Sequence, residues 1–157
     1  MDGEGGGRFF SAESLAESIA AKWPEGETSG RRFVVCTGGE PLLQLDEAFV
    51  DALHGHDFEI AVETNGTQSA PKGLDWICVS PKGHAQVVLE TGDELKLVFP
   101  QVDAIPAAFE KLGFRHFFLQ PMDGPNREHN TRLAVEYCRA HPKWRLSLQT
   151  HKMLGIP

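Results

Sequence analysis

An apolar run ends in a glycine-rich turn in the stretch Phe33-Val34-Val35-Cys36-Thr37-Gly38-Gly39-Glu40-Pro41. The run is typical of a β-strand. The two glycines have no Cβ, so the backbone after the strand can turn sharply and approach a ligand closely. Glu40 adds a carboxylate that can bind an ammonium group, and Pro41 stiffens the chain that leaves the turn. A strand-to-helix turn with an incidental charge would also explain Gly-Gly alone, so the rest of the chain decides between the two.

Length and composition indicate one α/β domain over residues 1–157, large enough to bury a core. The 41% hydrophobic content is that of a globular protein. No apolar run reaches the length of a membrane span and no secretory leader is recognisable, so we expect a cytoplasmic protein with no membrane partner. The formal net charge of −7 argues against nucleic acid as a partner, because no basic stripe is present to contact phosphates.

The three cysteines, Cys36, Cys78 and Cys138, lie far apart in apolar segments, and the sequence has no Cys-x-x-Cys pair. We expect each to be a reduced, buried thiol that packs as a small hydrophobic side chain. A disulfide framework is not expected. Metal ligands usually cluster locally, so we expect no zinc or iron–sulfur site from these three residues alone.

Strand and helix patterns alternate after a glycine-rich opening loop at residues 1–10. The predicted strands, which are short and apolar, are 32–36, 58–63, 76–79, 95–99, 117–119 and 144–148. The predicted helices are 11–23, which Pro24 stops, one that Asp46 caps, 104–112, and one that ends at His141-Pro142. This alternation predicts a parallel sheet covered by helices. The pattern leaves open whether the sheet is open or part of a barrel.

Polar residues follow nearly every predicted strand. These strand ends are Thr37 to Glu40, Glu63 to Gly66, Ser80 to Lys82, Gln120 to Asp123, and Gln149 to Lys152. In parallel α/β folds the carboxyl ends of all strands lie at one edge of the sheet, where ligands bind. We therefore expect one shared site at this edge.

Simpler explanations exist for several of these residues. Asn65-Gly66 is a strong turn dipeptide, and Ser80-Pro81-Lys82 could be a strand stop. Lys96 could face solvent, or it could be an inward cation for an anionic substrate. His151 follows a strand end and can exchange protons near neutral pH.

The sequence has no serine hydrolase elbow, Walker loop or Gly-x-Gly-x-x-Gly motif, so those enzyme classes lack their local signatures.

A family resemblance rests on several stretches that occur in order through essentially the whole chain, namely 33–43, 60–67, 76–82, 94–98, 117–124 and 146–152. The first is similar to the Gly-Gly-Glu segment of radical S-adenosylmethionine (radical SAM) enzymes. The ordered set, which ends in Gln149-Thr150-His151-Lys152, more narrowly resembles the 7-carboxy-7-deazaguanine synthase family of queuosine and deazapurine biosynthesis.

The resemblance implies a parallel-sheet partial (β/α) barrel of the radical SAM type that works as a homodimer. The implied enzyme is a carbon–nitrogen lyase that contracts the ring of 6-carboxy-5,6,7,8-tetrahydropterin to 7-carboxy-7-deazaguanine and releases ammonia. In that family a [4Fe-4S] cluster reductively cleaves S-adenosylmethionine, Mg²⁺ assists the ring contraction, and an external donor such as a flavodoxin supplies the electron.

The resemblance also assigns residues by position. Gly39 and Glu40 would contact the methionine part of S-adenosylmethionine. The remaining residues assigned to this cofactor are Ser80, Pro81, Lys82, Gln120, Pro121, Met122 and Asp123. Thr37 and His151 would face the pterin, and Pro157 would place its terminal carboxylate against the donor groups of the pterin.

The chain departs from the family at its N-terminal end. The family's N-terminal third carries a three-cysteine motif, a magnesium-binding threonine and a Gln-Gly-Glu substrate loop, and this sequence has none of them. We therefore expect an N-terminally truncated portion, from a late start assignment or a split gene, with no catalytic or metal residue of its own. Two other interpretations stay open: a non-catalytic module that binds S-adenosylmethionine or a pterin, and an α/β fragment with no ligand.

Overall fold

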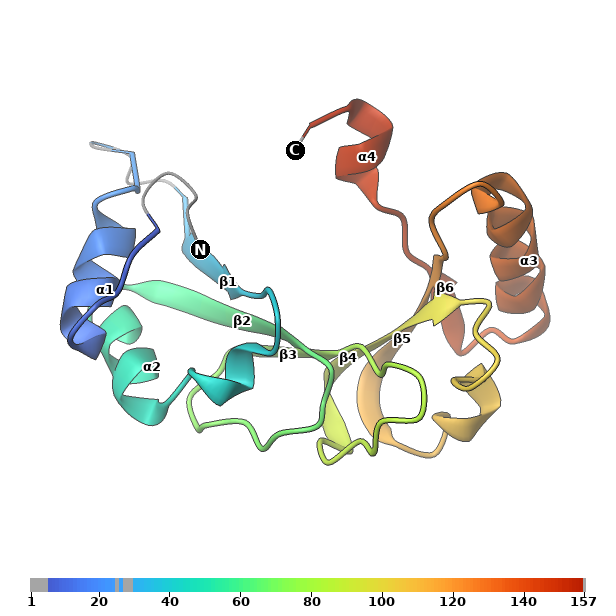
Figure 1. Ribbon diagram of the computed structural model, residues 1–157, viewed down its shortest axis with the longest axis horizontal. Coiled ribbons are helices and arrows are strands. Elements are labelled where there is room, and N and C mark those ends of the chain that lie inside the picture. The colour runs from blue at the N-terminus through green and yellow to red at the C-terminus, as the bar shows by residue number, and fades with distance from the viewer. Residues whose placement is uncertain (1–5, 25, 27–29, 157) are drawn as a thin grey trace.

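The computed structural model describes residues 6–24, 26 and 30–156. In these residues one sheet holds six parallel strands in chain order: β1 (Arg32–Cys36), β2 (Phe58–Thr64), β3 (Trp76–Val79), β4 (Thr91–Phe99), β5 (Gly113–Pro121) and β6 (Trp144–Leu146). The sheet curves into an open arc with β1 and β6 at its two ends (Figure 1). This confirms the α/β class and the partial-barrel form of the fold.

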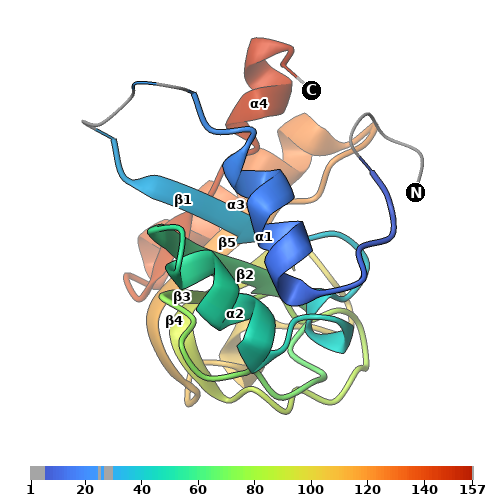
Figure 2. The ribbon, with the colours of Figure 1, turned by 90° about the vertical axis from the view of Figure 1, so that its left-hand side faces the viewer.

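Helices cover the outer, convex face of the sheet. α1 (Ala12–Ala20) and α2 (Glu47–His54) lie side by side outside β1 and β2 (Figure 2), and α3 (Arg127–Ala140) lies outside β5 and β6. Ser11 caps α1 with a capping box, and Asp46 caps α2 by accepting a hydrogen bond from the Phe49 N–H. The short α4 (Thr150–Leu154) lies on the open side of the arc (Figure 1). No described helix has the length and apolar character needed to cross a membrane.

The core forms two apolar clusters between the sheet and these helices. Val50 and Leu53 of α2 pack on Ile60 and Val62 of β2 in the first cluster. The second lies between α3 and β4 to β6, and its buried members are Val79, Leu95, Leu97, Phe114, Phe117, Leu119, Ala134 and Trp144. Because strand side chains alternate between faces, the residues between these core positions point to the concave face of the sheet.

Some element bounds differ from those predicted. The predicted helix 104–112 is wrong: the structure has only a 3₁₀ turn, η2 (Pro106–Ala108), followed by further i→i+3 bonds to Phe109 and Leu112. The Ala108, Phe109 and Leu112 N–H groups bond to carbonyls three residues before them and not four, so no α-helix forms before β5 begins at Gly113. The predicted helix 11–23 ends earlier as an α-helix, at Ala20, because 3₁₀-type bonds take over up to Trp23.

Candidate functional site

A cavity of about 360 Å³ lies at the carboxyl ends of the parallel strands. Residues from β2, from β4 and from the turns after β1, β2, β3 and β6 line it, together with one residue near the end of β5. The lining residues are Thr37, Gly38, Gly39, Glu63, Thr64, Asn65, Ser80, Lys82, Lys96, Val98, Gln120 and Gln149. The structure thus brings all five predicted strand ends to one cavity, which we call the strand-end cavity.

The Thr-Gly-Gly turn gives the strand-end cavity an open backbone wall. Gly38 has φ = 96°, in the left-handed region that favours glycine. A Cβ on Gly38 or Gly39 would have no described atom within 4 Å. The backbone of both residues is therefore exposed to a ligand, as the sequence predicted for this turn.

The carboxylate of Glu40 ties the turn after β1 to the turn after β2. Oε1 accepts hydrogen bonds from the Leu42 N–H (3.1 Å) and the Thr64 hydroxyl (2.6 Å), and Oε2 accepts one from the Asn65 N–H (2.9 Å). A carboxylate has about four acceptor positions. Among the described residues, these three bonds leave one position on Oε2 for a ligand donor.

The turn after β2 is both a tight turn and part of the site. The Thr64 hydroxyl accepts the Gly66 N–H at 3.0 Å, and the Asn65 side chain accepts the Thr67 N–H at 2.9 Å. Gly66 has φ = 79°, and a Cβ there would lie 2.6 Å from a methyl group of Val79. The Asn-Gly pair therefore forms the predicted turn, and Asn65 also lines the strand-end cavity.

Lys96 faces the strand-end cavity and not the solvent. Its side chain is only 16% exposed, and its Nζ lies 2.8 Å from Oε1 of Glu63 and 4.0 Å from Oε1 of Glu94. Burial lowers the pKa of Lys96, but the neighbouring Cys78, the hydrogen bond to Glu63 and the charges of both glutamates together raise it above its ordinary value. Lys96 is therefore a charged, paired lysine inside the site.

The three cysteines are free thiols that point to different parts of the fold. Cys36 packs against the first core cluster and Cys138 against the second, both half-buried, whereas Cys78 is buried in β3. Burial raises the pKa of Cys78 to about 12; the charge of Lys96 opposes this, and the two neighbouring glutamates add to it. Within the described residues no group of three His, Cys, Asp or Glu side chains could hold a metal ion. The three thiols therefore do not fit an iron–sulfur cluster.

The predicted cofactor residues after β5 are divided between two cavities. Gln120 lines the strand-end cavity, whereas Pro121 and Asp123 line a smaller cavity of about 180 Å³ beside α4. The carboxylate of Asp123 pairs with Lys152 of α4 at 2.5 Å, and this bond lowers the pKa of Asp123. Met122 is exposed, and its carbonyl accepts a hydrogen bond from the buried Asn130.

Other predicted residues also differ in position. Thr37, Ser80 and Lys82 line the strand-end cavity. Pro81, between Ser80 and Lys82, is fully buried and does not line this cavity. His151 is exposed on α4 and is not among the residues that line the strand-end cavity or the smaller one. Pro157 lies outside the described residues.

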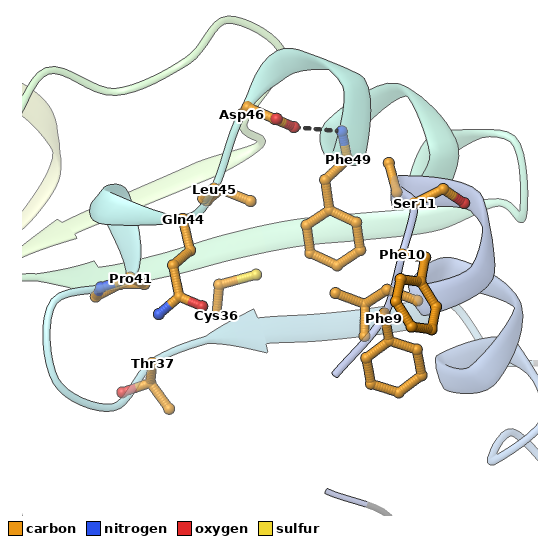
Figure 3. A pocket seen from close by; sticks show the side chains of 12 residues that line it. Phe9, Phe10, Ser11, Cys36, Thr37, Pro41, Gln44, Leu45, Asp46 and Phe49 are labelled. Atoms are coloured by element: carbon orange, nitrogen blue, oxygen red, sulfur yellow. Dashed lines mark hydrogen bonds between the residues drawn. The ribbon is translucent and has the colours of Figure 1, made fainter. Parts of the chain in front are cut away.

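A third cavity, of about 370 Å³, lies between the segment before α1 and the start of α2. Figure 3 shows the rings of Phe9, Phe10 and Phe49 around it, with Thr37 at the end nearest the Gly-Gly turn. Its one lining carboxylate, Asp46, is engaged in capping α2. We call it the apolar cavity for its three phenylalanine rings, although Ser11, Thr37 and Gln44 also line it.

Glu63, Lys96 and Gln149 line the site, but the family resemblance assigned no ligand to them. The alternation in β4 could have indicated Lys96, because Leu95 and Leu97 on either side of it are core residues. The pairing of Lys96 with Glu63 depends on the position of β2 relative to β4, which lie on either side of β3, and no local sequence pattern carries that information.

Comparison with known proteins decides the family. No family model matches the chain. Over 99% of its length the chain is 64% identical to the 7-carboxy-7-deazaguanine synthase of Bordetella pertussis and 62% identical to that of Caulobacter vibrioides, covering 73% of each relative. The chain belongs to the 7-carboxy-7-deazaguanine synthase family. The crystal structure of QueE from Escherichia coli is similar to this family member with a TM-score of 0.68 and 32% sequence identity.

The sequence matches only part of the length of its relatives in the 7-carboxy-7-deazaguanine synthase family. The superposition on QueE covers 88% of this chain and 63% of the QueE chain. The comparisons confirm the family assigned from the ordered motifs. The ligand-binding roles of the individual residues remain predictions, because the comparisons concern whole chains.

Proposed function

We propose that this chain serves the synthesis of 7-carboxy-7-deazaguanine, and that its strand-end cavity binds S-adenosylmethionine next to 6-carboxytetrahydropterin. The observation that carries the proposal is the convergence of five strand ends on one polar cavity, in a chain that closely matches named synthases over 99% of its length. The proposed reaction contracts the pterin ring with release of ammonia, which makes the enzyme a carbon–nitrogen lyase.

The residues of the strand-end cavity fit S-adenosylmethionine. The open backbone of Gly38 and Gly39 can approach the aminoacyl end of the cofactor. Glu40 keeps one acceptor position for its ammonium group. Ser80, Lys82 and Gln120 supply further polar groups in the same cavity. When bound, this cofactor supplies the radical chemistry of the family, and the role of these residues is to hold and orient it.

The described residues do not fit the other two groups that the family implies. Cys36, Cys78 and Cys138 lie on separate elements, and no described acidic cluster could hold Mg²⁺. We infer that ligands for a [4Fe-4S] cluster and for Mg²⁺ come from outside the described residues, and we derive no step through either group. From family membership alone we also infer a homodimer and an external electron donor such as a flavodoxin.

A non-catalytic binding module is the second candidate function. Two observations favour it. The residues that could hold S-adenosylmethionine line one cavity, whereas the three thiols lie on separate elements. Reading the DNA upstream of Met1 separates the two. An in-frame Cys-x-x-Cys segment there supports the synthase, and its absence favours the binding module.

Calorimetry on the 157-residue chain tests the binding proposal. We expect saturable binding of S-adenosylmethionine and of 6-carboxypterin, an oxidised analogue that cannot undergo the reaction. Each ligand should still bind when the other is present, because the proposal places them side by side. A folded chain, verified by a cooperative thermal transition, that gives no heat with either ligand overturns the proposal.

A further inference from the structure

Four polar side chains meet on the concave face of the sheet, and two of them, Glu63 and Lys96, line the strand-end cavity. Glu63 of β2 lies in register with Cys78 of β3, which in turn lies in register with Glu94 of β4. Lys96 lies two residues beyond Glu94 on the same face and reaches across to Glu63. We call Glu63, Cys78, Glu94 and Lys96 the floor cluster.

The floor cluster carries one excess negative charge. Lys96 is positive and the two glutamates are negative, whereas Cys78, with a pKa of about 12, is a neutral thiol. The charge of Lys96 is therefore already offset by two carboxylates. This argues against the interpretation of Lys96 as a free cation for an anionic substrate, since the cluster as a whole attracts donors and cations.

Glu63 is the member of the floor cluster that is open to a ligand. Its side chain is 45% exposed and lines the cavity, whereas the side chain of Glu94 is 19% exposed and does not. The described residues give Glu63 one hydrogen bond, from Lys96 to Oε1. Glu40, by comparison, already accepts three hydrogen bonds. Glu63 is thus the more available carboxylate of the site.

We propose that Glu63 accepts hydrogen bonds from an N–H-donating group of the bound ligand, and that Lys96 is the positioning residue that holds this carboxylate toward the cavity. The inference rests on the proposed function. Two groups supply this donor chemistry: the ammonium of S-adenosylmethionine and the amino-pyrimidinone edge of the pterin. A charge-assisted bond to either one contributes both affinity and orientation.

Calorimetric titration of the chain with each ligand separately tests the role of Glu63. Glu63→Gln keeps the size of the side chain but removes its charge, and it should weaken binding of one ligand by about tenfold or more. The ligand that loses affinity identifies the donor group. Glu94→Gln is the matched control, because it removes the same charge from the same cluster outside the cavity, and it should change either affinity by less than about threefold.

The role of Lys96 is tested by a double-mutant comparison. Lys96→Met should weaken the same ligand as Glu63→Gln, and the two changes together should cost little more than Glu63→Gln alone, because Lys96 acts through Glu63. Lys96→Arg, which keeps the charge, should recover affinity. If the effects of Lys96→Met and Glu63→Gln simply multiply, Lys96 does not act through Glu63 and this part of the inference is overturned.

Three further results would count against the inference. Unchanged affinity of Glu63→Gln for both ligands overturns the role of Glu63 while leaving the proposed function in place. Equal losses in Glu63→Gln and Glu94→Gln show an effect of net charge and overturn direct contact. Failure of the unaltered chain to bind either ligand overturns the proposed function, and this inference with it. Thermal transitions of each variant verify that the compared chains are folded.

Discussion

Glu40 shows how a single residue can join two parts of a site. The sequence motif suggested only a partner for an ammonium group. In the structure its carboxylate also binds the Leu42 and Asn65 N–H groups and the Thr64 hydroxyl. This second role could not be predicted from the motif, because Thr64 and Asn65 approach Glu40 only through the pairing of β1 with β2.

We predict that Glu40→Gln destabilises the chain even without a ligand. An amide has one oxygen where the carboxylate has two, so its NH₂ group would face at least one of the three donors that Glu40 now accepts. We expect the free energy of unfolding to fall by about 1.5–3 kcal/mol, the range for a hydrogen bond to a charged group. Urea denaturation followed by circular dichroism measures this change.

Glu59→Gln is the control for this experiment. Glu59 lies on β2 and pairs with Arg31 at 2.6 Å, but both side chains are well exposed, so its loss should cost less than about 1 kcal/mol. Equal stability of Glu40→Gln and the unaltered chain would contradict the structural role of Glu40.

At the scale of elements, local patterns predicted the strands better than the helices. The bounds of β1 and β3 agree with those predicted, because short β-branched and aromatic runs end at clear turn residues. The helix predicted at 104–112 is replaced by 3₁₀-type bonds. β4 and β5 begin earlier than predicted, because their pairing extends down to Thr91 and Gly113. That long pairing is a tertiary feature, which no local pattern carries.

Asp75 stabilises the entry to β3, and its contribution should depend on pH. It accepts the Ile60 N–H at 2.8 Å and lies 3.2 Å from Nε2 of His54, so it ties β2 and α2 to the start of β3. The Ile60 N–H lowers the pKa of Asp75 below its ordinary value of 3.8; burial opposes this, and His54 adds to it. A lowered folded-state pKa stabilises the fold above the unfolded pKa, and this stabilisation is lost as pH falls through the folded value.

We predict that Asp75→Asn is less stable than the unaltered chain at pH 6, by up to about 1 kcal/mol because the carboxylate is partly exposed. Asparagine keeps a neutral hydrogen-bond acceptor, so the difference in stability between the two chains reports the contribution of the Asp75 charge. It should shrink as the pH is lowered below 3.8. Melting temperatures of both chains between pH 3 and pH 7 measure it, with Asp51→Asn on the exposed face of α2 as the control. A difference that stays constant down to pH 3 would contradict the assignment.

At the scale of the whole molecule, the curved sheet separates the core from the candidate site. The helices cover its convex face (Figure 1), and the two core clusters lie between them and the sheet. The floor cluster lies on the opposite face, and the strand-end cavity lies at the carboxyl ends of the strands. The parallel topology and the shared site at the carboxyl ends could be predicted from the alternating pattern alone. The division of the predicted cofactor residues between two cavities could not, since it depends on how α4 packs beside the turn after β5.

Amide NMR spectra of the 157-residue chain, recorded as S-adenosylmethionine is added, test the central claim most directly. The account predicts that the largest shifts fall on the strand-end cavity, at Gly38, Gly39, Asn65, Ser80 and Gln120. The amino ends of the strands, near Arg32 and Phe58, should shift little. Shifts that centre on the apolar cavity near Phe9 and Phe10, or no shifts at saturating ligand, would contradict it.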